Sequence, residues 1–393
     1  MSEFPKYDYI IAGAGCAGLS LAMHLLHSNK FSNKRILIVD KVKEKSNDRT
    51  WCFWQIEPSL FDGIVFKTWS KLWFHGENFS TKMDISPYQY KMIRGIDFYE
   101  YCFKKIGQNK KVDILFEQVE SVFSNERAGV VVNGESIFAD YVFNSILFEK
   151  PKLQVDDLWL LQHFKGWIIE TEVNEFDRYV GTLMDFRIDQ SAGTAFCYVL
   201  PLSSRRALIE HTLFSDRLLE EQEYNDGLKS YISKTLQISS YKILEEEFGI
   251  IPMTGYKFPS HQGNVINIGT AGGQTKGSTG YTFQFIQKHS RAIVDALINA
   301  KTPIIKPASR RFDFYDRVLL KVLSSGMASG KEVFTNLFKK NRIDKVFKFL
   351  DNETLLAEEV KIIASLPSMP FLKAGTPQFS KLVSRLIRPL KGE

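Results

Sequence analysis

The sequence GAGCAG at residues 13–18 decides the fold, because it stands between a short apolar segment and a helical pattern. Residues 7–12 predict a buried strand, residues 17–26 have helical spacing, and residues 35–40 (RILIVD) predict a second buried strand. A G-x-G-x-x-G motif in this setting, followed by an acidic residue at the end of the second strand, is typical of a dinucleotide-binding βαβ unit. A glycine-rich turn without a ligand is the alternative interpretation.

Each position of this fingerprint has a physical reason. Gly13 allows the tight turn, Gly15 lets the backbone approach a pyrophosphate, and Gly18 lets the helix pack closely on the strand. We expect the pyrophosphate at the helix N-terminus and Asp40 on a ribose hydroxyl. An unbroken NAD domain would continue to alternate strands and helices. This chain leaves that pattern after Asp40 and returns to it more than 200 residues later, which favours FAD.

The rest of the chain predicts an α/β protein with interleaved parts. We expect a Rossmann-like FAD-binding domain of the glutathione-reductase type, an interleaved antiparallel β-sheet substrate domain and a helical C-terminal region. A β-meander is predicted over residues 116–145, and the pattern is helical from residue 311 onward. The predicted parts are FAD-binding segments at 1–75, 76–145 and 256–300, a substrate and catalytic sheet at 146–255, and a helical region at 301–393.

Composition excludes several classes of protein. With 44% apolar and 24% charged residues, the 393-residue chain is globular rather than disordered. It contains no apolar run of about 18 residues, so we predict no membrane span. The four cysteines form no C-x-x-C pair and stand near no histidine at metal spacing, so we predict reduced thiols and no metal site. No signal-peptide pattern precedes the first strand, and we therefore expect a cytoplasmic protein.

The positive charge is concentrated in one segment. Residues 301–350 carry twelve Lys and Arg against four Asp and Glu, whereas the whole chain has a net charge of only +6. A basic helical segment rich in Phe and Leu fits either a solvated face or an anionic membrane surface. No nucleic-acid-binding module accompanies it, so we expect no nucleic-acid partner.

Four further segments, together with the glycine fingerprint, resemble the lycopene cyclases over nearly the whole chain and in the same order. Departures from the family pattern are Gln55, where many relatives have an acidic residue, His211, where another acid is common, and Thr270, where flavin hydroxylases usually have Asp. The segments that carry the resemblance are DRTWCFW at 48–54, PLS at 201–203 with LIEHT at 208–212, GTAGG at 269–273 with STGYTF at 278–283, and SLP at 365–367 with PFL at 370–372.

This resemblance implies a non-redox, acid-catalysed reaction. The implied substrates are lycopene and the half-cyclised γ-carotene, whose linear ends would close to β-rings. Glu210 matches the essential acidic residue of the family. Strand alternation puts it on one face with Leu208 and Thr212, while Ile209 and His211 face the other way, so we interpret His211 as structural. Burial on an apolar strand would keep the Glu210 proton in place. A solvent-facing strand glutamate is the alternative.

The resemblance also implies reduced FAD as the working form, with NAD(P)H as an indirect reductant. Aromatic faces could stabilise a carbocation, and Trp51, Phe53 and Trp54 are candidates, although they would also suit an ordinary core. Arg94, just before a predicted helix, could pair with a phosphate. The predicted cofactor-binding residues are Gly13, Gly15, Gly18, Asp40, Arg94, Val119, Gly269, Gly272 and Gly273.

A C40 polyene is a membrane solute, so the enzyme would reach it from the membrane surface. Residues 382–388, and Phe334, Leu337 and Phe338 beside two lysines, could dock there or pack as core. Two other readings remain open. One is a flavin-dependent reductase or hydroxylase acting on an apolar substrate, and the other is a non-catalytic flavin-bound scaffold or carotenoid carrier.

Overall fold

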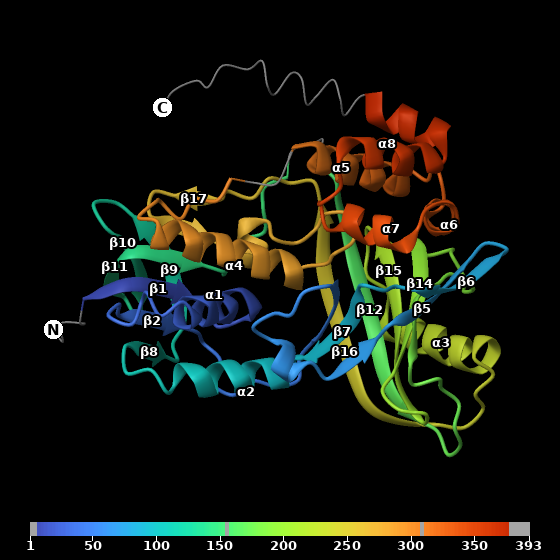
Figure 1. The fold of residues 1–393 in the computed structure, drawn as a ribbon, viewed down its shortest axis with the longest axis horizontal. Coiled ribbons are helices and arrows are strands. Elements are labelled where there is room, and N and C mark those ends of the chain that lie inside the picture. The colour runs from blue at the N-terminus through green and yellow to red at the C-terminus, as the bar shows by residue number, and fades with distance from the viewer. Residues whose placement is uncertain (1–5, 154–156, 307–309, 377–393) are drawn as a thin grey trace.

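The predicted βαβ unit is present at the start of the chain (Figure 1). The strands β1 (Tyr7–Ala12) and β2 (Ile36–Val39) pair in parallel, and α1 (Cys16–His27) connects them. The computed structural model describes residues 6–153, 157–306 and 310–376. Apart from the partly buried Asp8 of β1, every residue of both strands is buried, as expected for strands covered on two faces.

The parallel sheet is completed by strands from distant parts of the chain. On one side β2 pairs with β8 (Val112–Leu115), and on the other β1 pairs with β11 (Glu135–Asn144), which pairs with β18 (Val265–Asn267). The return of β18 after more than 100 residues confirms the split layout. The antiparallel strand β17 (His261–Gln262) lies at the edge.

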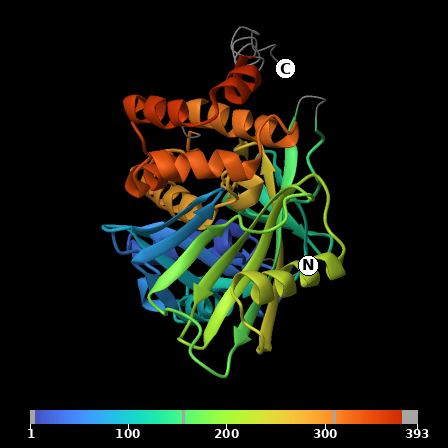
Figure 2. The ribbon, with the colours of Figure 1, turned by 90° about the vertical axis from the view of Figure 1, so that its right-hand side faces the viewer.

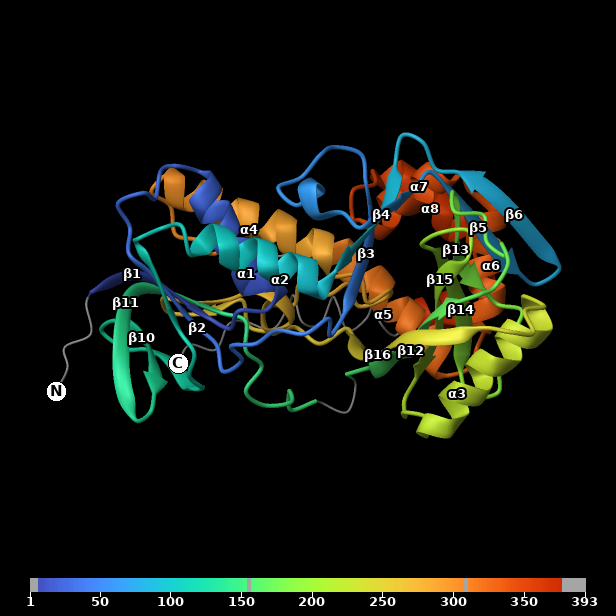
Figure 3. The same ribbon diagram turned by 90° about the horizontal axis from the view of Figure 1, so that it is seen from below.

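This sheet has different layers on its two faces. Three helices, α1, α2 (Gly95–Ile106) and α4 (Phe283–Ile298), share one apolar core on the first face. On the second face lies the predicted β-meander, formed by β9 (Val119–Ser124), β10 (Ala128–Val132) and β11. The result is a helix layer, a parallel sheet and a meander, and these pack together at one end of the molecule (Figure 3).

The other end is a seven-stranded sheet in the order β16-β12-β15-β14-β13-β5-β6. The predicted boundary at residue 75 falls inside β5, and β5 and β6 both belong to this sheet because β5 pairs with β13 over a sequence separation of more than 100 residues. A three-stranded sheet, β3-β7-β4, lies between the two ends. The strands are β3 (Thr50–Gln55), β4 (Lys67–Trp69), β5 (Lys71–Gly76), β6 (Phe79–Asp84), β7 (Gln89–Arg94), β12 (Trp159–Glu170), β13 (Val180–Asp185), β14 (Thr194–Pro201), β15 (Arg206–Ser215) and β16 (Lys242–Thr254).

Helices cover both faces of the seven-stranded sheet (Figure 2). On one face α3 (Glu221–Ser230) packs over β15. On the other face lie the C-terminal helices, which are α5 (Arg310–Ser324), α6 (Gly330–Lys340), α7 (Ile343–Leu350) and α8 (Leu356–Ser365). This confirms the helical C-terminal region over the described residues.

Aromatic stacking fixes α6 to the sheet. The ring of Phe338 stacks on Phe74 of β5 at 4.4 Å between centroids, and Phe334 stacks on Phe186 at 5.8 Å. Both helix residues, and Leu337 between them, are at most 5% exposed. These three side chains are therefore core and not a membrane-docking surface. The other predicted docking segment, 382–388, lies outside the described residues.

The helices and the cysteines can be compared with the predictions from composition. Within the described ranges, no helix has both the length and the apolar composition needed to cross a bilayer. All four cysteines are free, and three of them are buried.

We predict that Phe74→Ala lowers the free energy of unfolding by about 3 to 5 kcal/mol, because it leaves a cavity between β5 and α6. Chemical denaturation of the purified protein measures this change. The matched control is Phe148→Ala, at a side chain that is 42% exposed, where we expect a change within about 0.5 kcal/mol. Equal effects of the two substitutions would contradict this account of the packing.

Candidate functional site

One cavity of about 480 Å³ connects the glycine fingerprint to the seven-stranded sheet. At one end it is lined by Gly15 at the N-terminus of α1 and by Gly269. At the other end it is lined by Tyr198 and Glu210, on β14 and β15. The two halves of the protein thus contribute opposite ends of a single space. A ligand bound at the glycine loop would extend towards the carboxyl group of Glu210.

The fingerprint glycines have three different surroundings. Gly13 has a φ of +97°, a conformation that side chains rarely adopt. A Cβ on Gly18 would lie 1.9 Å from the carbonyl oxygen of Gly13, so this residue makes the close helix–strand approach. A Cβ on Gly15 would meet nothing within 4 Å, because that position faces the cavity. The first turn of α1 is therefore open to a ligand, with its free N–H groups available.

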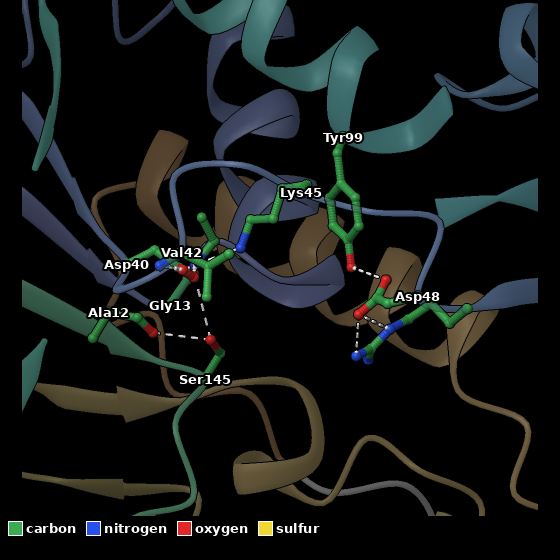
Figure 4. Close-up of polar contacts among 10 residues, drawn as sticks. Ala12, Gly13, Asp40, Val42, Lys45, Asp48, Tyr99 and Ser145 are labelled. Carbon is green, nitrogen blue, oxygen red and sulfur yellow. Dashed lines mark hydrogen bonds and ion pairs between the residues drawn. The ribbon is translucent and has the colours of Figure 1, made fainter. Parts of the chain in front are cut away.

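Asp40 holds the loop together from the end of β2 (Figure 4). Its Oδ2 accepts a hydrogen bond from the backbone N–H of Ala14 at 2.6 Å. Its Oδ1 accepts from the N–H of Val42 at 2.8 Å and from Nζ of Lys45 at 3.1 Å. The predicted contact of Asp40 with a ribose stays a prediction. The same close-up shows Ser145 donating to the carbonyl of Ala12 at 2.9 Å, which ties the loop to the end of β11.

The second glycine loop closes over α1 from the other side. Gly269 has a φ of +60°, and a Cβ there would lie 2.6 Å from the Cβ of Ala17, so the loop and α1 are in direct contact. Gly269 and Thr270 line the cavity, whereas Gly272 and Gly273 form the short turn that follows. Lys276, further along the loop, donates to Asp316 and Asn352, each at 2.8 Å. These bonds fasten the loop to the C-terminal helices.

Glu210 lies in the cavity wall as strand alternation predicts. Leu208 and Glu210 line the cavity, and Thr212 Oγ1 donates to Glu210 Oε1 at 2.6 Å. Burial, followed by the nearby Glu247, raises the pKa of Glu210 to about 8. Glu210 is thus protonated at neutral pH. His211 points the opposite way, into contact with Gly227 of α3, and burial lowers its pKa to about 4.

A second carboxyl group meets Glu210. Glu247, on β16, lies beside Glu210; burial raises the pKa of both carboxyl groups, and the neighbouring Glu247 raises the pKa of Glu210 further. Each carboxyl group therefore keeps its proton to a higher pH than an exposed glutamate does. Thr50 Oγ1 donates to Glu247 Oε2 at 2.7 Å. Sequence reasoning missed Glu247 because it is the third residue of the run 245–247, which resembles a solvated charged edge.

Comparison with known proteins places the chain in a family. The sequence model described as "Lycopene cyclase protein" matches residues 8–376. The chain belongs to the lycopene cyclase family. It is 25% identical to the lycopene beta-cyclase of Pantoea ananas over 259 residues, which are 64% of this chain and 63% of that relative. The match thus spans less than two thirds of the relative's length.

Solved structures show the same fold at low sequence identity. A geranylgeranyl bacteriochlorophyll reductase-like protein from Thermoplasma acidophilum has a TM-score of 0.56 at 12% identity, over 97% of this chain and 98% of that one. A flavin-dependent brominase has a TM-score of 0.51 at 12% identity, over 97% and 99%. The fold of this lycopene cyclase family member is that of flavin-dependent enzymes, which confirms the predicted fold class.

The family's aromatic motif is divided between the cavity and the core. Of its three aromatic residues, only Trp51 lines the cavity. Phe53 stacks on Phe283 at 4.6 Å within the helix-layer core, and Trp54 stacks on the ring of Phe347 at 4.3 Å. These two residues are 2% and 3% exposed, so the structure does not bring them to the site. Alternation along β3 turns Trp54 to the opposite face, against Phe347 of α7, while Phe53 shares the face of Trp51 and is covered by Phe283 of α4.

Three tyrosines supply the cavity aromatics that sequence reasoning missed. Tyr90, Tyr198 and Tyr281 come from three separate elements and line the cavity together. The hydroxyl oxygens of Tyr90 and Tyr281 lie 3.3 Å apart, and Tyr281 also bonds with Tyr198. Burial raises the pKa of each phenol, so all three are neutral. Only Tyr281 could have been found from sequence, since it belongs to the STGYTF segment.

Two predicted cofactor-binding residues lie away from the cavity. Arg94 donates to both carboxylate oxygens of Asp97, at 2.6 and 2.7 Å, and its guanidinium lies 4.2 Å from the centre of the Phe66 ring. Val119 is buried in the core between the parallel sheet and the meander. Arg49, within the DRTWCFW segment, lines the cavity instead, where it pairs with Asp48 at 2.7 Å.

The cavity residues fit a flavin dinucleotide. Gly15 and the open first turn of α1 suit a pyrophosphate, and the loop at Gly269 and Thr270 bounds the space beyond it. Gln162 Oε1 is buried in the cavity wall and has no hydrogen-bond partner among the described residues. Buried polar atoms are almost always satisfied, so this oxygen points to a ligand donor. No cluster of metal-ligating side chains occurs in the described part of the chain.

The glycine geometry yields a paired prediction. Gly18→Ala should destabilise the fold by about 1 to 3 kcal/mol, because the new Cβ overlaps the Gly13 carbonyl. Gly15→Ala should leave thermal stability nearly unchanged in protein stripped of cofactor, since the position is open and its backbone is extended. The same Gly15→Ala protein should retain less flavin, which absorbance at the flavin bands measures. Equal flavin content in Gly15→Ala and the parent protein would contradict the pyrophosphate site.

Proposed function

We propose that this protein cyclises the linear ends of lycopene, by way of γ-carotene, to the β-rings of β-carotene, as an isomerase of the intramolecular lyase type. The observation that carries the proposal is a protonated carboxyl group, Glu210, at the far end of a cavity that begins at a dinucleotide loop. Family membership and the relative named lycopene beta-cyclase support this substrate class.

The cofactor would be FAD in its reduced form, with NAD(P)H as an indirect reductant. Gly13, Gly15 and Gly18 would hold the pyrophosphate end, while Asp40 would accept from the ribose. Gly269, Gly272 and Gly273 would shape the loop over the ring end, and Gln162 Oε1 would accept a hydrogen bond. Reduced flavin supplies negative charge near a developing carbocation, which explains its use in a reaction without net redox change.

Glu210 would act as the general acid. Its O–H bond breaks as a C–H bond forms at the terminal double bond, leaving a tertiary cation on the neighbouring carbon. The next double bond attacks that carbon and closes the six-membered ring, and loss of a ring proton completes the isomerisation. An alkene is a very weak base, so the acid must be close, protonated and sheltered from water. Burial of Glu210 meets these needs.

The aromatic cavity wall would stabilise the cation without trapping it. Trp51, Tyr90, Tyr198 and Tyr281 line the cavity with aromatic rings, and the hydroxyl groups of the three tyrosines are neutral. Ring quadrupoles attract a cation, whereas a neutral phenol is a poor nucleophile. Phe53 and Trp54 would contribute indirectly, by holding β3 and thereby Trp51 in position.

The first test is to express the chain in a bacterium that accumulates lycopene and to analyse the pigments. We expect a change from red to orange-yellow and cyclic products with the mass of lycopene, because cyclisation moves protons only within the molecule. Glu210→Gln should abolish ring closure, by a factor of about 100 or more, with the flavin still bound. His211→Gln, on the opposite face of the same strand, serves as the matched control and should keep most of the activity.

Products of altered mass would instead favour a flavin-dependent reductase or hydroxylase. Unchanged lycopene beside a folded, flavin-loaded protein would overturn the proposed substrate. Full activity of Glu210→Gln would remove Glu210 from its role and leave the substrate assignment intact.

Substrate would be drawn from a membrane surface. Five apolar side chains at the N-cap of α8, on α8 and in the segment after it are between 59% and 68% exposed, and the exposed Lys361 and Lys373 lie close to them in sequence. An apolar patch with nearby cations suits the surface of an anionic bilayer. The five apolar residues are Leu355, Leu356, Val360, Met369 and Leu372.

We predict that the double variant Leu356→Glu, Val360→Glu binds vesicles containing anionic lipid less than half as well as the parent protein. Sedimentation with vesicles measures binding. The matched control, Ile243→Glu with Leu244→Glu on exposed β16, should bind normally. Equal losses in both double variants would place the membrane contact elsewhere.

A further inference from the structure

The contact between the two carboxyl groups depends on strand register. On β12, Gly166 is the residue directly paired with Glu210 of β15 on one side and with Glu247 of β16 on the other. Residues in one row of a sheet point to the same face, so both glutamates flank Gly166 on one face of the sheet. The row continues to Tyr198 of β14, which is directly paired with Glu210 of β15. Four strands thus place three polar side chains in one line.

Gly166 is the residue that allows the two glutamates to meet. Their Cα atoms stand two strand spacings apart, about 10 Å, with the middle strand between them. A Cβ on Gly166 would lie 2.9 Å from Cγ and 3.1 Å from Oε1 of Glu247. The glutamate side chain therefore lies across the glycine towards Glu210. Any other residue at this position would occupy the space through which the carboxyl groups make contact.

Glu247 is held in this position and does not itself line the cavity. Its Oε2 accepts from Thr50 at 2.7 Å, whereas its buried Oε1 lies over Gly166 and has no hydrogen-bond partner among the described residues. It lines a separate small hollow together with Glu245, Arg94 and Thr50. Only Glu210 of the two faces the large cavity, where the substrate would bind. Glu247 therefore acts on the reaction through Glu210.

We propose that Glu210 and Glu247 share one proton across Gly166, and that Glu247 is the positioning residue that keeps Glu210 in its acid form. This inference rests on the proposed function and adds a role for a residue with no direct substrate contact. Two carboxylates in contact cannot both ionise easily, because each charge disfavours the other. The pair therefore retains one proton at a pH where a lone carboxyl group would have lost it.

Few other charges face the pair. Cys52, Tyr198 and Tyr281 are neutral, since burial raises the pKa of each. Glu245 adds a further negative charge near Glu247, and Arg94 is engaged by Asp97. Thr50 and Thr212 donate hydrogen bonds that oppose the upward shifts. The effect of Glu247 on the pKa of Glu210 is thus the main charge interaction that a substitution at Glu247 can remove.

The test is the pH dependence of cyclisation by purified, flavin-loaded protein, reduced with dithionite, with lycopene supplied in vesicles. The parent protein should lose activity as the pH rises through about 8, when the shared proton dissociates. Glu247→Gln keeps the shape and removes the charge, so Glu210 should lose its proton more easily. We expect the alkaline midpoint to fall by about one pH unit or more.

Glu246→Gln is the matched control, since this neighbour on β16 faces away and pairs with Lys165 at 3.0 Å. Its pH profile should equal that of the parent protein. Thr50→Val, which removes the hydrogen bond to the Glu247 carboxylate, should move the midpoint in the opposite direction, upward. Thr50→Val also tests the proposal by itself if Glu247→Gln fails to fold.

An alkaline midpoint that stays within 0.2 of a pH unit in a folded Glu247→Gln protein, or in Thr50→Val, would overturn the shared-proton proposal. Lack of cyclisation by the parent protein at every pH would instead overturn the proposed function. The two failures are therefore distinguishable. A loss of rate at all pH values without a shift would show that Glu247 acts only by supporting the structure.

Discussion

The pairing of β12 with both β15 and β16 is the constraint on which the site depends. These three strands run antiparallel over ten and twelve paired positions, so their register fixes which side chains share a face. A slip of one residue would turn Glu210 towards α3 and bring His211 to the cavity. Long pairing with apolar layers on both faces makes such a slip costly. The sheet thus holds a carboxyl group in a place that a loop could not define as well.

The cavity exists because two differently built halves meet around it. The glycine loops belong to the parallel sheet and its helices, while the carboxyl groups belong to the antiparallel sheet. Lys276 joins the second glycine loop to the C-terminal helices through Asp316 and Asn352, and Trp54 donates to Asp351 at 2.9 Å. Stacking of Trp54 on Phe347 adds an apolar contact to the same junction. These contacts keep the two ends of the cavity at a fixed separation.

Local patterns predicted much of this arrangement. The fingerprint at 13–18 carried its own strand, turn and helix, and alternation along β15 was enough to orient Glu210 and His211. Features that depend on pairing between distant strands could not be predicted from the sequence. Glu247 is inward-facing only because β16 pairs with β12 in one register, and β5 joins the second sheet only through β13. Trp54 and Phe53 share a motif with Trp51, but only the packing of helices on β3 decides which ring reaches the cavity.

The chemistry suited to this cavity differs from that of a redox enzyme of the same fold. Hydride transfer or oxygen activation requires a substrate atom close to the flavin and does not depend on a buried, protonated carboxyl group. Here the cavity wall opposite the glycine loop carries a carboxyl group beside a second one. Neutral phenols, a thiol and aromatic side chains lie around them, and Glu245 adds one further negative charge near Glu247. In the proposed reaction, such a lining would hold a proton, release it to a very weak base, and surround the resulting cation with negative potential rather than with a nucleophile. A fold shared with redox enzymes thereby becomes suited to acid catalysis, through the side chains of a few strands and without a change in its framework.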